Sequence, residues 1–159
     1  MADDNDCLNP MDEVEKPFIE YEDEEIFSQY WCDPNKLGKW ELFYPQTVLN
    51  EKWHAAVALY RAGQISGIQS MKCSTGAVNS SGRQRDRGVI MFACGPYEEE
   101  ETVLQYGRNL VEKMSYCNAI GTVTYKTDKQ STIGKKSIFI NKNYYYKIPV
   151  PTDEDPAKA

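Results

Sequence analysis

The sequence predicts an α+β fold, in which two helices cover one face of a single antiparallel sheet. Short segments rich in β-branched and aromatic residues are typical of strands, and two longer segments repeat apolar residues at helical spacing. These segments follow one another in the order β-α-β-β-α-β, which is the order of a split β-α-β arrangement. A C-terminal hairpin is expected to complete the sheet.

The first half of the predicted domain contains a strand, a helix and a second strand. Residues 39–44 are rich in aromatic residues and stop at Pro45, as is typical of a strand. Asn50 is a suitable N-cap for a helix that Gly63 can end. Residues 65–73 alternate well enough to predict a second strand. The apolar stripe of the helix consists of Trp53, Ala56, Val57 and Tyr60.

The second half begins with a long polar loop over residues 74–87. Residues 88–94 form an apolar segment that predicts a third strand, and residues 98–114 predict a second helix with acidic residues in its first turn. Residues 122–126 predict a fourth strand. The stripe of this helix consists of Val103, Gly107, Leu110 and Met114. The expected hairpin consists of strands at 137–140 and 144–148 around a polar turn.

Charge is divided unevenly along a chain of 159 residues with net charge −6. Residues 1–33 hold 12 of the 24 acidic residues and one base, whereas the rest of the chain holds 17 bases and 12 acids. We expect a disordered acidic arm over residues 1–25, a single domain over 26–150 and an acidic tail over 151–159. A strongly acidic chain with a basic body can still bind a polyanion through its local charge.

Several function classes are disfavoured by the sequence. No apolar run approaches the roughly 20 residues that span a bilayer, and the N-terminus lacks the features of a signal peptide, so we expect a cytoplasmic or nuclear protein without a membrane partner. The five cysteines are scattered and lack the spacing of metal ligands, which predicts reduced thiols, no structural zinc and no cofactor.

Catalysis is also disfavoured. His54 is the one histidine, and no phosphate-binding loop of the Gly-x-x-x-x-Gly-Lys-[Ser/Thr] type is present. The carboxylates lie in the acidic arm or at helix starts, so the sequence marks no pair for acid and base roles. We therefore expect a protein that is not an enzyme. A deep pocket that holds His54 beside a cysteine or carboxylate would revive the enzymatic alternative.

Two basic segments give the leading hypothesis, a module that binds RNA or a phosphate-bearing nucleotide. One segment closes the loop before the third strand and the other follows the fourth strand, so the topology can bring them together as one electropositive rim. Arginine offers paired donors to a phosphate and lysine offers a point charge. A purely solubilising role is the alternative. The candidate phosphate-binding residues are Arg83, Arg85, Arg87, Lys126, Lys129, Lys135 and Lys136.

The second hypothesis is a protein-interaction or regulatory module. Residues 26–33 include Ile26, Phe27, Tyr30 and Trp31, and together with the acidic arm they can dock on a protein partner. Trp31 is the tryptophan expected at the surface, where it is a candidate for aromatic stacking, while the other two are expected in the core. The third strand holds Val and Met where an RNA recognition motif needs aromatic residues, which argues against that module.

Three short segments carry a resemblance to a known family. They are Gly38–Phe43, Trp53 within Glu51-Lys52-Trp53, and Thr124–Asp128 followed by Ser131–Gly134. These segments resemble the opening strand, the helix tryptophan and the closing strand and loop of the translation initiation factor 4E-like fold. The chain similarly resembles the basophilic-leukaemia-expressed-protein family, which shares that fold. The resemblance covers about residues 37–140.

The resemblance implies a phosphate-binding surface more than recognition of a base. Cap-binding members of the 4E-like group sandwich a methylguanine between two tryptophans and bind its edge with a carboxylate. The basic residues of this chain match the positions that bind the phosphates in that group. The loop over residues 74–87, however, contains no tryptophan and no glutamate. Trp40 and Glu41 cannot replace that pair, because adjacent strand residues face opposite sides.

Overall fold

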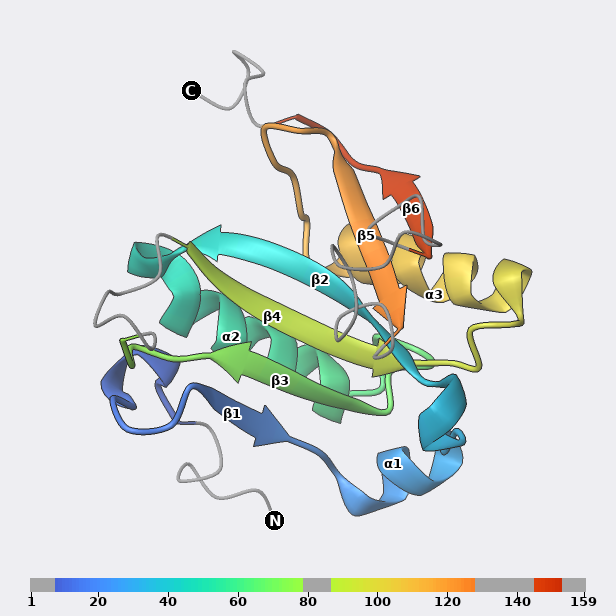
Figure 1. Cartoon of the computed structure of the whole chain (residues 1–159), viewed down its shortest axis with the longest axis horizontal. Helices are drawn as coiled ribbons and strands as arrows, with labels where there is room; N and C mark the ends of the chain where they lie inside the picture. The colour runs from blue at the N-terminus through green and yellow to red at the C-terminus, as the bar shows by residue number, and fades with distance from the viewer. Residues whose placement is uncertain (1–7, 79–86, 128–144, 153–159) are drawn as a thin grey trace, which may run out of the picture.

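The computed structural model describes residues 8–78, 87–127 and 145–152, and its central feature is one six-stranded antiparallel sheet (Figure 1). The strand order is β1-β3-β4-β2-β5-β6, so chain neighbours are often not sheet neighbours. The predicted α+β class is confirmed. The strands are β1 (Phe18–Tyr21), β2 (Gly38–Pro45), β3 (Ser70–Ser74), β4 (Arg87–Cys94), β5 (Thr122–Thr127) and β6 (Tyr146–Pro149).

Both long helices lie behind the sheet in the view of Figure 1, so they cover the same face of the sheet, as predicted. Among the described residues, the α-helices are α1 (Glu24–Gln29), α2 (Gln46–Arg61) and α3 (Glu100–Lys113), and the 3-10 turns are η2 (Pro10–Asp12) and η3 (Pro34–Lys36). None of the described helices is long and apolar enough to cross a membrane.

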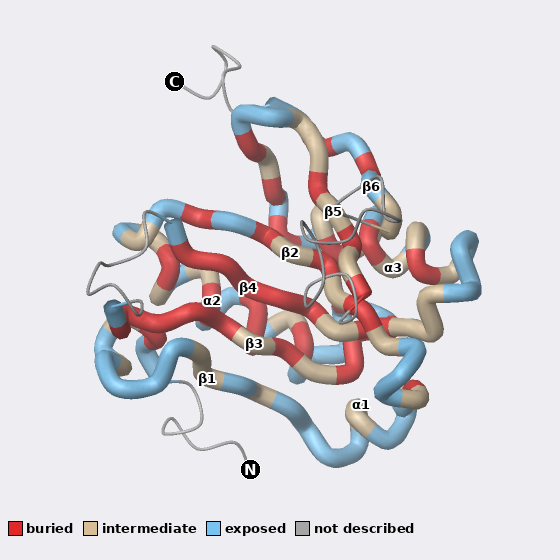
Figure 2. The backbone as a smooth tube through the Cα atoms, viewed as in Figure 1, coloured by how far each residue is buried: buried red, intermediate tan, exposed pale blue. Residues whose placement is uncertain are grey.

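The core lies between the helices and the sheet, and both predicted core tryptophans are in it. Trp40 of β2 is 0% exposed and Trp53 of α2 is 1% exposed. Figure 2 shows the buried residues concentrated in the central strands of the sheet. Gly107 lets α3 approach β2 closely, because a Cβ there would lie only 2.5 Å from Trp40 Cε2. The buried apolar area of this layer is the main source of stability.

Helix α2 begins four residues before the predicted N-cap. Pro45 precedes its first turn, where the fixed φ of proline stops the strand and favours a helix start. Asn50 therefore lies inside the helix, and its Oδ1 accepts a hydrogen bond from Met11 N at 2.9 Å. The side chain that was expected to cap α2 instead holds η2 against it.

The prediction that residues 1–25 form a disordered arm is wrong for residues 8–25. β1 pairs antiparallel with β3 from Phe18↔Ser74 to Tyr21↔Met71, so this segment is an edge of the sheet. Ile19 and Tyr21 pack against the core, and that apolar burial outweighs the acidic composition around them. The domain therefore begins well before residue 26, while residues 1–7 lie outside the described residues.

Two other boundaries differ from the prediction. The second predicted strand is shorter, because Gly67 has φ +85° and the chain turns before Ser70, although Ile65 and Ile68 are still buried. β6 pairs with β5 from Thr122↔Pro149 to Tyr125↔Tyr146. The other half of the predicted hairpin, residues 137–140, lies outside the described residues, as do residues 153–159 of the predicted tail.

Candidate functional site

The candidate site is the open face of the sheet, which we define as the face opposite α2 and α3. Because side chains alternate along a strand, Trp40, Leu42 and Tyr44 point to the helices and their neighbours point to the open face. The register places one row of open-face residues across all six strands. This row consists of Glu20, Lys72, Met91, Glu41, Thr124 and Lys147.

The next row brings two lysines directly opposite each other. Lys39 of β2 is the register partner of Lys126 of β5, and Lys39 is also the partner of Ala93 of β4. Like charges at directly opposed positions of an antiparallel pair are destabilising. The charged open-face residues are Lys39, Lys72, Lys126, Lys147 and Arg87, with Glu20, Glu22 and Glu41.

Two ion pairs connect some of these charged side chains. Lys126 Nζ lies 3.5 Å from Glu41 Oε1, and Lys72 Nζ lies 3.7 Å from Glu20 Oε1. The Glu41 side chain is only 12% exposed, and within the described residues its Oε1 contacts Lys126 in that ion pair but makes no hydrogen bond. Since a buried carboxylate is costly to leave without a partner, the ion pair with Lys126 offsets part of the cost of burying Glu41.

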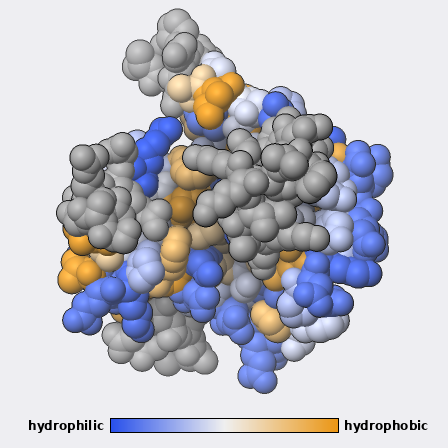
Figure 3. Space-filling model, in the orientation of Figure 1, coloured by the Kyte–Doolittle hydropathy of each residue, from blue (hydrophilic) through white to orange (hydrophobic). Residues whose placement is uncertain are grey.

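An apolar strip runs along the middle of the open face between these charges (Figure 3). Phe43 of β2 is 41% exposed, and its register partner Val89 and the nearby Met91 are buried residues of β4. Ala93 continues the strip toward the end of β4. An exposed aromatic ring on the face of a central strand is the type of residue that can stack against a flat ligand.

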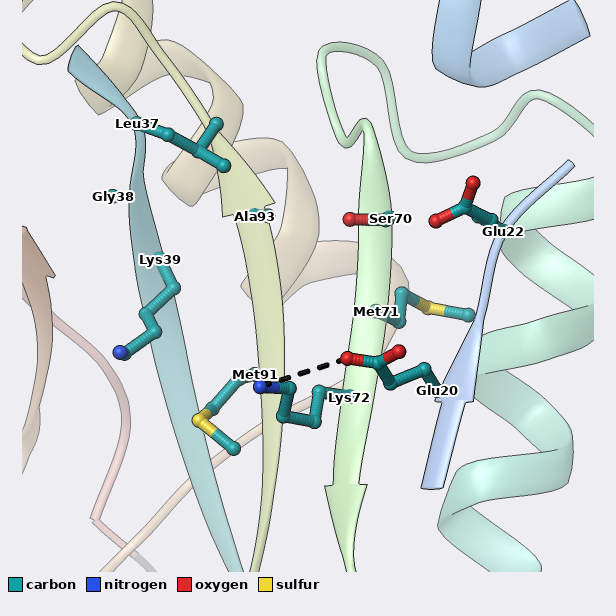
Figure 4. A pocket seen from close by; sticks show the side chains of 10 residues that line it. All are labelled: Glu20, Glu22, Leu37, Gly38, Lys39, Ser70, Met71, Lys72, Met91 and Ala93. Carbon is teal, nitrogen blue, oxygen red and sulfur yellow. Dashed lines mark ion pairs between the residues drawn. The ribbon is translucent and has the colours of Figure 1, made fainter. Parts of the chain in front are cut away.

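A pocket of about 180 Å³ lies at one end of this face, between the ends of β1 and β4 and the starts of β2 and β3. In Figure 4 the Lys72 side chain extends from β3 across β4, with Glu20 reaching it from β1 and Met91 beside it. The pocket is therefore lined both by apolar residues and by positively and negatively charged side chains. Its lining residues are Glu20, Glu22, Leu37, Gly38, Lys39, Ser70, Met71, Lys72, Met91 and Ala93.

The two predicted basic loops leave the sheet at opposite ends. Arg87 at the start of β4 is opposite Pro45, whereas Lys126 near the end of β5 is opposite Lys39. At about 3.3 Å per residue, the two attachment points are roughly 20 Å apart along β2. β2 lies between β4 and β5, so these strands are not neighbours. The other predicted residues, Arg83, Arg85, Lys129, Lys135 and Lys136, lie outside the described residues.

Trp31 is at the surface, as its position in the sequence predicted. Its exposed fraction is 62%, and it follows α1 in a segment that is tied to the domain. The next residue, Cys32, is buried, and its N donates a hydrogen bond to Gln69 Oε1 at 3.1 Å. Tyr30 contacts Tyr106 of α3 in an edge-to-face arrangement. Trp31 is thus held in place with its ring open to solvent, although it does not line the pocket.

The groups that an enzyme would need do not converge in the described part of the chain. His54 is exposed on α2, where its Nε2 lies 2.7 Å from Asn9 Oδ1. Burial raises the pKa of the Cys73 thiol to about 12 and also raises the pKa of Cys94, so neither is a thiolate near pH 7. The described residues contain no cluster of His, Cys, Asp or Glu that could hold a metal.

Most of the open-face residues were not predicted from the sequence, because the clusters of basic residues in the two loops are the stronger local signal. The signal that could have found them is the alternation within the strands: Lys39 and Glu41 flank Trp40, and Lys72 lies between Met71 and Cys73. Charged residues at every second position of a strand indicate a face that is open to solvent. Phe43 breaks this pattern, and its exposure follows from the structure alone.

Comparison with solved structures identifies the fold as that of translation initiation factor 4E. The chain is similar to a schistosome eIF4E complexed with m7GpppG and 4E-BP, with a TM-score of 0.54 and 15% identity over 74% of this chain and 63% of that one. It is also similar to Ascaris suum eIF4E-3 with m7G cap, with a TM-score of 0.53 and 14% identity over 75% of this chain and 62% of that one. A third similar structure is C. elegans eIF4E-3 with the 4E-binding protein Mextli and a cap analog, with a TM-score of 0.51 and 16% identity over 64% of this chain and 57% of that one.

At these identities the likeness shows the fold alone. The chain spans less than two thirds of the length of each of these three structures. No model of a protein family matches the sequence, and a search of curated proteins found no match to it.

Proposed function

We propose that this chain is a non-catalytic module that binds RNA or a phosphate-bearing nucleotide on the open face of its sheet. The observation that carries the proposal is the pairing of Lys39 with Lys126 across β2 and β5, in a chain whose net charge is −6. Two lysines at directly opposed positions repel each other. Lys126 already lies beside Glu41, and a phosphate between the two lysines would add negative charge and a charge-assisted hydrogen bond to each ammonium group.

The two basic loops complete the proposed surface. Their attachment points lie at opposite ends of the open face, so a ligand on this face lies between them. In the proposal the bases of these loops add phosphate contacts beyond those of the strands. The loop residues are Arg83, Arg85 and Arg87 at one end, and Lys126, Lys129, Lys135 and Lys136 at the other.

The similar solved structures support a nucleotide ligand for this fold. They include eIF4E proteins with m7GpppG, with m7G cap and with a cap analog. For this chain we extend the proposal to membership of the basophilic-leukaemia-expressed-protein branch of the fold. The loop before β4 has no tryptophan or glutamate, so the proposal names the phosphate groups rather than a methylated base as the recognised feature.

Titration of a fluorescent RNA at several salt concentrations tests the proposal. Binding should weaken steeply with salt, because each phosphate contact releases a counterion. The triple variant Arg83→Ala, Arg85→Ala, Arg87→Ala and the single variant Lys126→Ala should both bind more weakly. The matched control removes three exposed bases from the helical side of the domain: Arg61→Ala, Arg108→Ala, Lys113→Ala.

Two results would overturn the proposal. One is the absence of RNA and nucleotide binding at low salt. The other is an equal loss of affinity in the control variant and in the open-face variants, since this would show that only the overall charge matters.

A second candidate function is a protein-interaction module that uses residues 26–33. The observation that favours it is the exposed ring of Trp31 on a segment that is fixed by Cys32 and Tyr30. Aromatic residues of this kind are frequent hot spots of protein interfaces. Because β1 belongs to the sheet, deletion of residues 1–33 would damage the fold, and Trp31→Ser is the cleaner variant.

The test for this second function compares the proteins retained by the wild type and by Trp31→Ser from a cell extract. A partner that is lost only in Trp31→Ser, and that then binds the purified wild type, supports the module. Identical retained proteins would contradict it. We place both functions in the cytoplasm or nucleus, which imaging of a tagged full chain would check.

A further inference from the structure

Phe43 is an exposed aromatic residue on a fixed part of the open face. The pairing of β2 with β5 runs from Gly38↔Thr127 to Glu41↔Thr124, so Phe43 lies beyond the end of that ladder. Its backbone is held instead by the Tyr116 hydroxyl, which accepts from Phe43 N at 3.1 Å and donates to Phe43 O at 2.9 Å. The ring is therefore presented from a rigid strand and loses little freedom when a ligand covers it.

The surroundings of Phe43 combine apolar area with positive charge. Val89 is its register partner on β4, and Met91 and Ala93 follow on the same face of that strand. Arg87 lies at the same end of β4, two residues before Val89, while Lys39 and Lys126 lie at the other end of β2. The open face thus has an apolar centre and a basic residue at each end.

We infer that the open face binds a single-stranded nucleic acid, with one unpaired base stacked on Phe43 and the backbone held by Arg87 at one end and by Lys39 and Lys126 at the other. This inference rests on the proposed function and names its ligand class. Aromatic rings on a surface with a basic groove are the common device for binding unpaired strands. A duplex keeps its base faces stacked internally, so it cannot use the exposed ring.

Charge complementarity selects this occupant over an apolar peptide. Among the described residues, the open face carries five cations and three carboxylates, and both Glu20 and Glu41 lie within 4 Å of a lysine. The cations at the two ends are roughly 20 Å apart, a span that fits several nucleotides of an extended strand better than one nucleotide. An apolar peptide would bury the ring but offer no phosphate to the basic residues at the two ends of the face.

Fluorescence anisotropy with a labelled single-stranded RNA of about 12 nucleotides tests the inference. Phe43→Ala should raise the Kd roughly 5- to 100-fold, the range of alanine substitutions at base-stacking residues, without changing the salt slope. Phe43→Tyr keeps the ring and should bind nearly as the wild type does. The control is Ile120→Ala, which shortens another exposed apolar side chain in the loop before β5, outside the strands. Thermal melts of each variant check that it is folded.

Three competitors identify the class of ligand. Unlabelled single-stranded RNA should displace the probe, whereas the duplex of the same sequence and a nucleoside triphosphate should require much higher concentrations. Displacement by an apolar peptide at lower concentrations than RNA would overturn the inference in favour of a peptide site.

The outcomes separate this inference from the proposed function. If RNA binds and Phe43→Ala binds as tightly as the wild type, the stacking inference fails and the phosphate-binding function stands. If affinity is lost in Trp31→Ala rather than in Phe43→Ala, the base stacks near α1 and the inference is wrong. If no RNA or nucleotide binds at low salt, both fail.

Discussion

The contact between Gly107 of α3 and Trp40 of β2 sets the position of the strand that carries the open-face residues, and it makes a quantitative prediction. In an exposed helix, Gly→Ala stabilises by up to about 1 kcal/mol, because alanine has the better helix propensity. Here the added Cβ would lie 2.5 Å from Trp40 Cε2. Such overpacking typically costs about 1–3 kcal/mol.

The surroundings of Trp40 leave its ring little room to move. Its side chain is fully buried, and its ring centroid lies 5.3 Å from that of Tyr125, whose hydroxyl donates to Cys94 O. We therefore expect the cost to exceed the propensity gain, so that Gly107→Ala lowers the free energy of unfolding by roughly 1–2 kcal/mol.

Urea unfolding of Gly107→Ala, Trp40→Phe and the double variant measures this effect. The smaller ring of Trp40→Phe makes room for the methyl group, so Gly107→Ala should be nearly neutral in that background, and the double-mutant cycle should show a coupling of about 1 kcal/mol or more. The reasoning is refuted if Gly107→Ala is as stable as the wild type or more stable, with an unchanged m-value.

Three further predictions concern the buried hydroxyl, the buried thiols and the open-face lysine. Burial raises the pKa of Tyr125 and Tyr44. The unfolded chain releases these protons near pH 10 while the folded chain retains them, so the free energy of unfolding should be constant below about pH 10 and fall above it. Urea unfolding at each pH measures this fall, which should be less steep in Tyr125→Phe. Cys73 and Cys94 should react with a thiol reagent near pH 8 only after unfolding in urea, and fast labelling of the native protein would contradict this. Lys126→Ala should reduce the slope of log affinity against log salt by about 0.7, and an unchanged slope would mean that Lys126 does not contact phosphate.

Periodicity in the sequence was enough to predict the central part of the fold. β2, α2, β4, α3 and β5 each have a continuous local pattern of apolar residues, and the structure contains all five. β1 could not be predicted in the same way, because only four residues, Phe18–Tyr21, pair with β3 and acidic residues follow them. Its stability comes from partners more than 50 residues away in the chain, such as Ser74 opposite Phe18.

The candidate site was predicted less well than the fold. Loop composition drew attention to Arg87 and Lys126, but whether two loops meet depends on the strand order, and β2 separates the strands that carry these residues. The pairing of Lys39 with Lys126 depends on the register between strands that are far apart in sequence. The exposure of Phe43 depends on where the β2–β5 ladder ends. These are tertiary facts that no local pattern contains.

The pairing of β2 with β5 also has a consequence for synthesis of the chain. Gly38 and its partner Thr127 are separated by nearly 90 residues. At roughly 5–20 residues per second, β2 leaves the ribosome about 4–18 s before the strand that covers its edge. During that interval one edge of the central strand is available to other chains, which is a known route to aggregation. Expression at a high level, when many incomplete chains are present together, should therefore lower the yield of native protein more than its final stability would suggest.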